Sequence, residues 1–116
     1  MKDFNHITAQ SLLNMTLNKI ENTYSDILST IISNINAKLI SKTDSKSFDY
    51  TVSTRIFEKW WGIDLSRVDE LTIIRFLCEY YHKKGFIVFS NNFHGVCQIT
   101  ICWGNFIYED KKIKIS

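Results

Sequence analysis

The segment Gly85–Trp103 constrains the fold of this chain more than any other stretch. It reads GFIVFSNNFHGVCQITICW, with two apolar runs on either side of the polar segment Ser90–Gly95. A short polar segment with glycine between two apolar runs is typical of a β-hairpin. In the second run the apolar residues alternate from Cys97 to Trp103, as a strand with one buried face requires. We therefore predict a hairpin over about residues 86–103.

The first run of this hairpin is apolar on both of its faces. Ile87 and Phe89 share one face, while Phe86 and Val88 share the other. A strand of this kind usually lies inside a sheet, or has a helix on one side and another chain on the other. We therefore include Phe86 and Val88 among the candidate partner-binding residues.

The clearest predicted helix covers about residues 67–84. Ser66 and Asp69 have the spacing of a capping box, with Asp where Glu is usual. Lys83 and Lys84 fall in the last turn, and Gly85 is suited to the left-handed position that ends a helix. The predicted buried stripe comprises Val68, Leu71, Ile74, Leu77, Cys78 and Tyr81, widened by Ile73, Phe76 and Tyr80.

A long helix is predicted over about residues 8–40, with Thr8 as its N-cap. Its apolar residues recur at intervals of three and four: Leu13, Leu17, Ile20, Tyr24, Ile27, Leu28, Ile31, Ile35 and Leu39. An unbroken helix of this length would measure roughly 48 Å, longer than one small domain can cover. Either the helix breaks near Asn22–Thr23, or its N-terminal half reaches another molecule, and we prefer the second interpretation.

A strand is predicted over about residues 47–53, after the polar connector Ser41–Ser47. Apolar and polar residues alternate from Phe48 to Ser53, and the polar side suits an edge position.

The aromatic segment 54–65 has two interpretations. It forms either a helical turn that begins at Ser53 and ends at Gly62, or a loop over the core. Its aromatic residues either close the end of the sheet, which we prefer, or contact a partner, as Trp often does at interfaces. The candidate partner-binding residues here are Phe57, Trp60 and Trp61.

These elements predict one α+β domain over residues 1–116, in the order helix, strand, helix, strand, strand. The sheet is expected to be antiparallel with three strands, or four, and both helices should pack on one of its faces. The tail stretch Asn105–Tyr108 is a further candidate strand.

The charge balance, the cysteines and the length of the apolar runs each argue against one class of function or location. With 14 basic and 12 acidic residues the formal net charge is +2, too small for the basic field of a non-specific nucleic-acid-binding protein. Three cysteines and no secretory signal predict free thiols in a reducing compartment, and a protein that is not secreted. No run approaches the roughly 20 apolar residues of a membrane span, so no membrane partner is expected.

Metal and catalytic motifs are sparse. Cys97 and Cys102 should point to opposite faces of one strand, and Cys78 with His82 gives only a pair on one helix face. His6 completes the list of candidate ligands. His94, at the predicted hairpin tip, could titrate or bind a ligand, although we prefer a solvated turn histidine. We therefore expect no metal, no cofactor and no catalytic residue, and we predict that the protein is not an enzyme.

The order of elements resembles that of a loose group of small proteins encoded by tailed bacteriophages and other large DNA viruses. The matching stretches are Ile7–Ala9, Phe48–Tyr50, Lys84–Val88 and Ile101–Trp103, whereas segments 54–65 and 104–116 depart from the group. Some members of that group are virion structural components, so the resemblance implies a viral origin. It brings no catalytic or binding residue with it.

We therefore predict a non-enzymatic viral (phage) protein that acts through protein–protein contacts in the host cytoplasm or the virion. Its expected partners are further copies of itself, as a homo-oligomer, or other viral structural proteins of the virion or its assembly. The first alternative is a small anti-defence binder that sequesters a nucleotide or a host factor, which would give it a small-molecule ligand. The third interpretation, a nucleic-acid-binding module, would stack bases on Phe48, Tyr50 and Phe86, although we prefer to place these residues in the core.

Overall fold

The computed structural model describes residues 7–104, 106–109 and 112–115, with the backbone alone for Arg67, Val68, Phe93 and the last two ranges. His6, Asn105, Asp110 and Lys111 therefore lie outside the described residues. The helices and strands in chain order are α1 (Ala9–Thr23), α2 (Ser25–Asp44), β1 (Asp49–Ser53), α3 (Thr54–Trp61), α4 (Arg67–Lys83), β2 (Ile87–Phe93), β3 (Val96–Cys102), β4 (Phe106–Glu109) and β5 (Lys112–Ile115).

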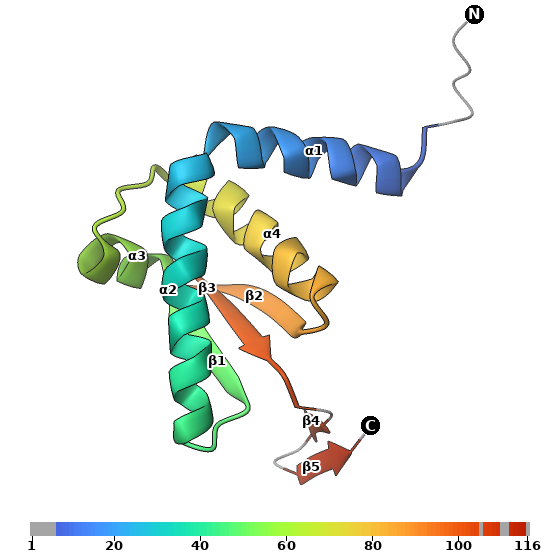
Figure 1. Cartoon of the computed structure of the whole chain (residues 1–116), viewed down its shortest axis with the longest axis vertical. Coiled ribbons are helices and arrows are strands. Elements are labelled where there is room, and N and C mark those ends of the chain that lie inside the picture. The colour runs from blue at the N-terminus through green and yellow to red at the C-terminus, as the bar shows by residue number, and fades with distance from the viewer. Residues whose placement is uncertain (1–6, 105, 110–111, 116) are drawn as a thin grey trace, which may run out of the picture.

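The fold is α+β, as the sequence predicts. Three strands form an antiparallel sheet in the order β1-β3-β2, and α2 and α4 lie against it (Figure 1). The core side chains of the sheet, Val52, Cys97, Ile99 and Ile101, all have one parity, so the helices cover one face. The tail strands β4 and β5 pair with each other in a separate two-stranded sheet and do not extend the main one.

The position of β2 differs from one of the two predictions. Its apolar character on both faces suggested an internal strand, but β2 is an edge and β3 is the central strand. The predicted edge position of β1 is confirmed. Strand β3 is central but has one face open to solvent, so its apolar and polar residues alternate. This alternation reports which face is buried, and it does not distinguish a central strand from an edge strand.

The hairpin turn is tighter than the polar segment Ser90–Gly95 suggested. Strand β2 continues through the two asparagines to Phe93, and only His94 and Gly95 form the turn. Both have positive φ, 51° and 77°, which is the conformation that a two-residue type I′ turn requires.

The predicted long N-terminal helix is two helices. The break lies at Tyr24, whose φ of −116° and ψ of 28° are not helical, and α2 continues past residue 40 to Asp44. The Tyr24 hydroxyl donates a hydrogen bond to the carboxylate of Asp69 in the first turn of α4. This bond lies at the break, where α1 turns away across the top of the domain (Figure 1). Thr8 is the N-cap of α1, as predicted, and forms a reciprocal capping box with Ser11.

The ends of α4 follow the predicted local rules. The Ser66 hydroxyl accepts a hydrogen bond from the Asp69 N–H at 3.2 Å, which caps the start of the helix. At the end, Gly85 has a φ of 96°, and the Phe86 N–H donates to the Tyr81 carbonyl at 3.2 Å. The rings of Tyr81 and Phe86 meet edge to face with 5.6 Å between centroids, the apolar contact that accompanies a Schellman motif.

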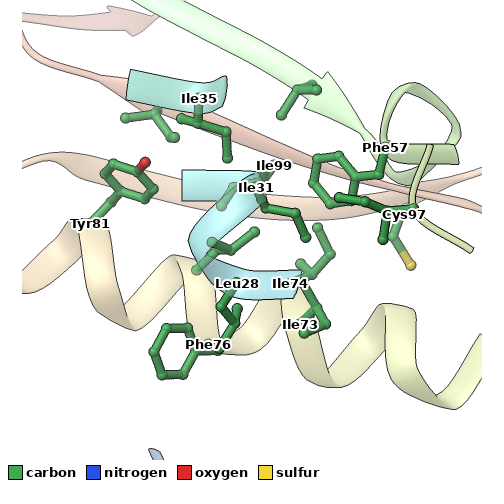
Figure 2. Close-up of a cluster of buried hydrophobic side chains, with 14 of the residues drawn as sticks. Leu28, Ile31, Ile35, Phe57, Ile73, Ile74, Phe76, Tyr81, Cys97 and Ile99 are labelled. Atoms are coloured by element: carbon green, nitrogen blue, oxygen red, sulfur yellow. The ribbon is translucent and has the colours of Figure 1, made fainter. Parts of the chain in front are cut away.

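The core lies between the sheet and the helices α2, α3 and α4 (Figure 2). Its fully buried large side chains are Ile31, Ile35, Phe57, Ile73, Leu77, Tyr81, Ile99 and Ile101. The predicted stripe of α4 is confirmed at Ile74, Leu77 and Tyr81, and Ile73, predicted to widen it, is completely buried, whereas Leu71 is 41% exposed. The middle of α4 is apolar around most of its circumference, so periodicity alone does not select the buried face. The side chain of Val68 lies outside the described residues.

Candidate functional site

The outer face of the sheet, opposite the helices, is the first candidate surface. The strand register places three side chains of each strand there: Asp49, Thr51 and Ser53 of β1, Gln98, Thr100 and Cys102 of β3, and Ile87, Phe89 and Asn91 of β2. We call these residues the open sheet face. Among them Asp49 has the single charge, and the hydroxyls of Thr51 and Thr100 lie 2.8 Å apart in a cross-strand hydrogen bond.

The apolar part of the open sheet face belongs to β2. Ile87 is 47% exposed and Phe89 is 53% exposed. Strand β2 reads IVFSNNF, without the proline, lysine or other charged residues that commonly protect a sheet edge from pairing. An uncharged, partly apolar edge strand of this length is a surface suited to association with another strand.

The hydrogen-bond phase of the sheet shows which backbone groups this edge offers. The Trp103 N–H donates to the Phe48 carbonyl at 3.0 Å, so these two residues form a hydrogen-bonded pair. Hydrogen-bonded and non-bonded pairs alternate along an antiparallel ladder. By this alternation, the residues of β2 that hydrogen-bond to β3 are Ile87, Phe89 and Asn91. The backbone N–H and C=O groups of Val88, Ser90 and Asn92 therefore point to the free edge of β2.

The candidate residues Phe86 and Val88 do not lie on this open face. Both are half-buried and pack against the core, and Phe86 contacts the Tyr81 ring. Partner binding through these two side chains stays a prediction, and the more exposed pair on this strand is Ile87 and Phe89. The backbone of Val88 does point to the edge, but its side chain packs inward.

The aromatic segment 54–65 divides between the two predicted roles. It begins as the helix α3, with Ser53 as N-cap and Gly62 at a φ of 67° as its left-handed end, which confirms the helical alternative. Phe57 has no exposed surface and belongs to the core, so its prediction as a partner-binding residue is wrong. Trp60 is 75% exposed and Trp61 is half-buried, so partner binding stays a prediction for these two.

Trp60 and Trp61 line a groove at the other edge of the sheet. This β1 groove has a volume of about 500 Å³ and runs between α2, β1 and α3. Its lining consists of Lys38, Lys42, Tyr50, Thr51, Val52, Ile56, Trp60 and Trp61. The ring of Trp61 stacks on buried Phe57 with 5.0 Å between centroids, which anchors that wall of the groove.

A second groove lies beneath α1, where this helix crosses α4. Its volume is about 480 Å³, and its lining consists of Leu13, Thr16, Leu17, Ile20, Thr72, Arg75, Phe76, Cys78, Glu79 and Ser90. Burial raises the pKa of the Cys78 thiol, against the opposing effect of its hydrogen bond with Ser90. A raised pKa is the opposite of what an activated cysteine nucleophile needs.

The other cysteines are placed as predicted. Cys97 is buried while Cys102 is half-exposed on the other face of β3, and all three thiols are free. Burial also raises the pKa of Cys102. Cys78 and the exposed His82 are two candidate ligands without a third. The described ranges contain no group of three His, Cys, Asp or Glu residues that could hold a metal ion.

Within the described residues, no helix is long and apolar enough to cross a membrane. Comparison of the chain with protein-family models, with curated proteins and with solved structures finds no match. The resemblance to phage-encoded proteins therefore stays a prediction.

Two features of these surfaces were missed from the sequence. The lysines of the β1 groove fall four residues apart on the polar side of α2, a spacing that places them on one helix face. Nothing local indicates that this face meets Trp60, because the contact depends on how α3 packs. The exposure of Ile87 and Phe89 follows from the hairpin register, because Phe89 pairs with Thr100 and cross-strand partners share a face. The polar side of β3 could therefore have indicated which face of β2 is exposed.

Proposed function

We propose that this chain is a non-enzymatic protein that acts through protein–protein contacts, and that it forms a homo-oligomer through the free edge of β2. The single observation that carries this proposal is an edge strand without charge that exposes Ile87 and Phe89. The resemblance to phage proteins supports the further proposal of a viral origin and a role in a virion or its assembly.

The proposed contact is an antiparallel pairing of β2 with β2 of a second copy. A two-fold axis at Phe89 or at Ser90 brings outward backbone groups of one copy opposite those of the other. In either register Val88 and Asn92 take part in the new ladder. The two sheets then become one continuous sheet, and the Phe89 rings of both copies lie on the same face, directly opposite or on a diagonal.

A second copy suits this surface because β2 is neutral. A charged partner would find no complementary charge on the strand, whereas identical neutral strands meet without repulsion. Pairing the two strands adds backbone hydrogen bonds at Val88, Ser90 and Asn92 and covers part of the exposed surface of Ile87 and Phe89. The rings stay on the open face of the joined sheet, so only part of their apolar surface offsets the cost of association. We therefore expect a weak dimer, with a Kd between micromolar and millimolar.

Sedimentation equilibrium over a wide concentration range tests the proposal. The 13.6 kDa chain should approach twice its mass as concentration rises from micromolar to millimolar. Phe89→Lys places a charge on the edge strand and should leave the protein monomeric, while its circular dichroism spectrum stays unchanged because Phe89 is exposed. Thr51→Lys is the matched control: it lies on the same face at the other edge, so it should not change the mass.

A wild-type protein that stays monomeric at millimolar concentration would contradict self-association. A dimer that Phe89→Lys leaves intact would show that another surface mediates it.

A second candidate function, sequestration of a small molecule, is favoured by the groove beneath α1. Its volume of about 480 Å³ lies in the range of small-molecule sites, and Arg75 supplies a cation beside an apolar lining. Thermal-shift measurements against nucleotides test this candidate. A nucleotide should raise the melting temperature of the wild type but not that of Arg75→Gln, and no shift with any nucleotide would count against it.

A further inference from the structure

The β1 groove has features that the proposed association through β2 does not use. It lies along the opposite edge of the sheet and touches three consecutive residues of β1, from Tyr50 to Val52. Successive side chains of a strand point to opposite faces. A groove that reaches residues of both faces must therefore run along the edge of the strand itself.

The backbone of β1 offers hydrogen-bonding groups to this groove. Because Phe48 pairs with Trp103 through a hydrogen bond, alternation directs Tyr50 and Val52 toward β3. The N–H and C=O groups of Thr51 then point to the free edge, as do those of Asp49. An extended peptide laid along the groove can pair with Thr51 as a new strand does.

One wall of the groove is basic. Lys38 and Lys42 lie one helical turn apart on α2, on the side of the sheet that the helices cover. The lining of the groove contains no acidic side chain to neutralise them. Asp49, the charged residue of β1, belongs to the open sheet face on the other side.

The other wall is apolar and aromatic. Ile56, Trp60 and Trp61 line it from α3, and the stacked contact of Trp61 with Phe57 holds this wall in place. Trp60 is 75% exposed, so most of its surface is available to a ligand. Exposed tryptophan beside a strand edge is typical of residues that anchor a bound peptide.

We propose that the β1 groove binds an extended acidic segment of another protein, which adds to the sheet as a strand next to β1. In the bound segment, the side chains opposite Tyr50 and Val52 point to the helix-covered side of the sheet. Acidic side chains at these positions form ion pairs with Lys38 and Lys42. A neighbouring apolar residue contacts Trp60 near the end of α3. The site is separate from the β2 edge, so this proposal is independent of self-association.

A nucleotide fits these features less well than a peptide. The lining supplies two lysines but no arginine fork and no glycine-rich loop to hold a phosphate group. The alternating donors and acceptors of a strand edge match a peptide backbone, whereas a nucleotide would leave them unused.

Fluorescence anisotropy with a labelled peptide of alternating valine and aspartate tests the proposal. The peptide should bind the wild type, and affinity should fall with added salt because Lys38 is exposed and Lys42 is half-exposed to solvent. The double variant Lys38→Gln/Lys42→Gln should weaken binding about tenfold or more. Lys59→Gln is the matched control, since Lys59 is exposed on α3 but does not line the groove, and it should leave affinity unchanged.

Two further probes separate strand addition from simple charge attraction. A peptide N-methylated at alternate residues keeps its carboxylates but loses half of its backbone N–H donors. Of the two possible methylation patterns, the one that removes the donors facing β1 should bind far more weakly. A peptide of alternating valine and lysine should not bind. The Phe89→Lys variant, which disrupts the β2 edge, should bind the acidic peptide as the wild type does.

Several results would overturn the proposal. They are no binding of the acidic peptide at millimolar concentration, equal binding of the lysine peptide, equal binding of all N-methylated forms, and unchanged affinity in the double lysine variant. Binding of ATP that the double variant abolishes, without any binding of the acidic peptide, would assign the groove to a nucleotide instead.

Discussion

The division of the aromatic segment between core and surface makes a sharp prediction about stability. Phe57 and Trp60 are three residues apart on α3, yet Phe57 is completely buried and Trp60 is 75% exposed. Figure 2 shows the Phe57 ring within the cluster of core side chains that includes Ile31, Ile99 and Cys97. Truncating these two aromatic residues should therefore have very different consequences.

The magnitudes follow from the exposed fractions. Phe57→Ala removes a buried ring and leaves a cavity, which costs about 3–5 kcal/mol. Trp60→Ala loses the burial of only about a quarter of an indole, roughly 1 kcal/mol or less. A domain of 116 residues has a total stability of roughly 6–17 kcal/mol, so the first variant loses a large share of it.

Urea denaturation followed by circular dichroism measures both variants. With a slope of about 2 kcal/mol per molar urea, Phe57→Ala should lower the midpoint by roughly 2 M and Trp60→Ala by about 0.5 M or less. If the alanine variant does not fold, Phe57→Leu should show a smaller loss in the same direction. Equal shifts for Phe57 and Trp60 would refute the assignment of one to the core and the other to the surface. Trp60→Ala should weaken peptide binding more than folding.

Three other predictions concern local features of the fold. Lys46 has a φ of 60°, so Lys46→Gly should raise the free energy of unfolding by about 0.5–1 kcal/mol in the same urea assay. The Tyr24 and Ser66 hydrogen bonds hold the pKa of Asp69 below its usual value of 3.8. The stability that these bonds contribute is therefore present above about pH 4 and is lost as pH falls through the lower folded pKa. Acid unfolding curves of Asp69→Asn should lack this loss of stability. The buried Tyr81 hydroxyl donates to the Asn36 side chain at 2.8 Å, so Tyr81→Phe should lower the melting temperature by a few degrees, about 1 kcal/mol.

The features that the sequence predicted well depend on local physics. The limits of α4 follow from a capping serine before it and a glycine after it, both of which act within one turn of the helix. The alternation along β3 likewise records which of its faces is buried. The same reasoning placed the strand β1 at an edge, because its outer face is polar.

The features that it did not predict depend on contacts between distant segments. At the break between α1 and α2, Tyr24 contacts α4 through a hydrogen bond to Asp69, a residue 45 positions away. The choice of β3 over β2 as the central strand depends on where β1 pairs, because both strands have an apolar face. The β1 groove exists because α3 places Trp60 across from two lysines of α2, and no periodicity within either helix indicates that meeting.

Amide hydrogen exchange at the edge of β2 tests the proposed association most directly. If β2 pairs with β2 of a second copy, the N–H groups of Val88, Ser90 and Asn92 become hydrogen-bonded, and their protection should rise with protein concentration. The N–H of Thr51, at the other edge, should exchange equally fast at every concentration. Protection at the three β2 amides that does not change with concentration, or a rise at Thr51 instead, would contradict pairing through this strand.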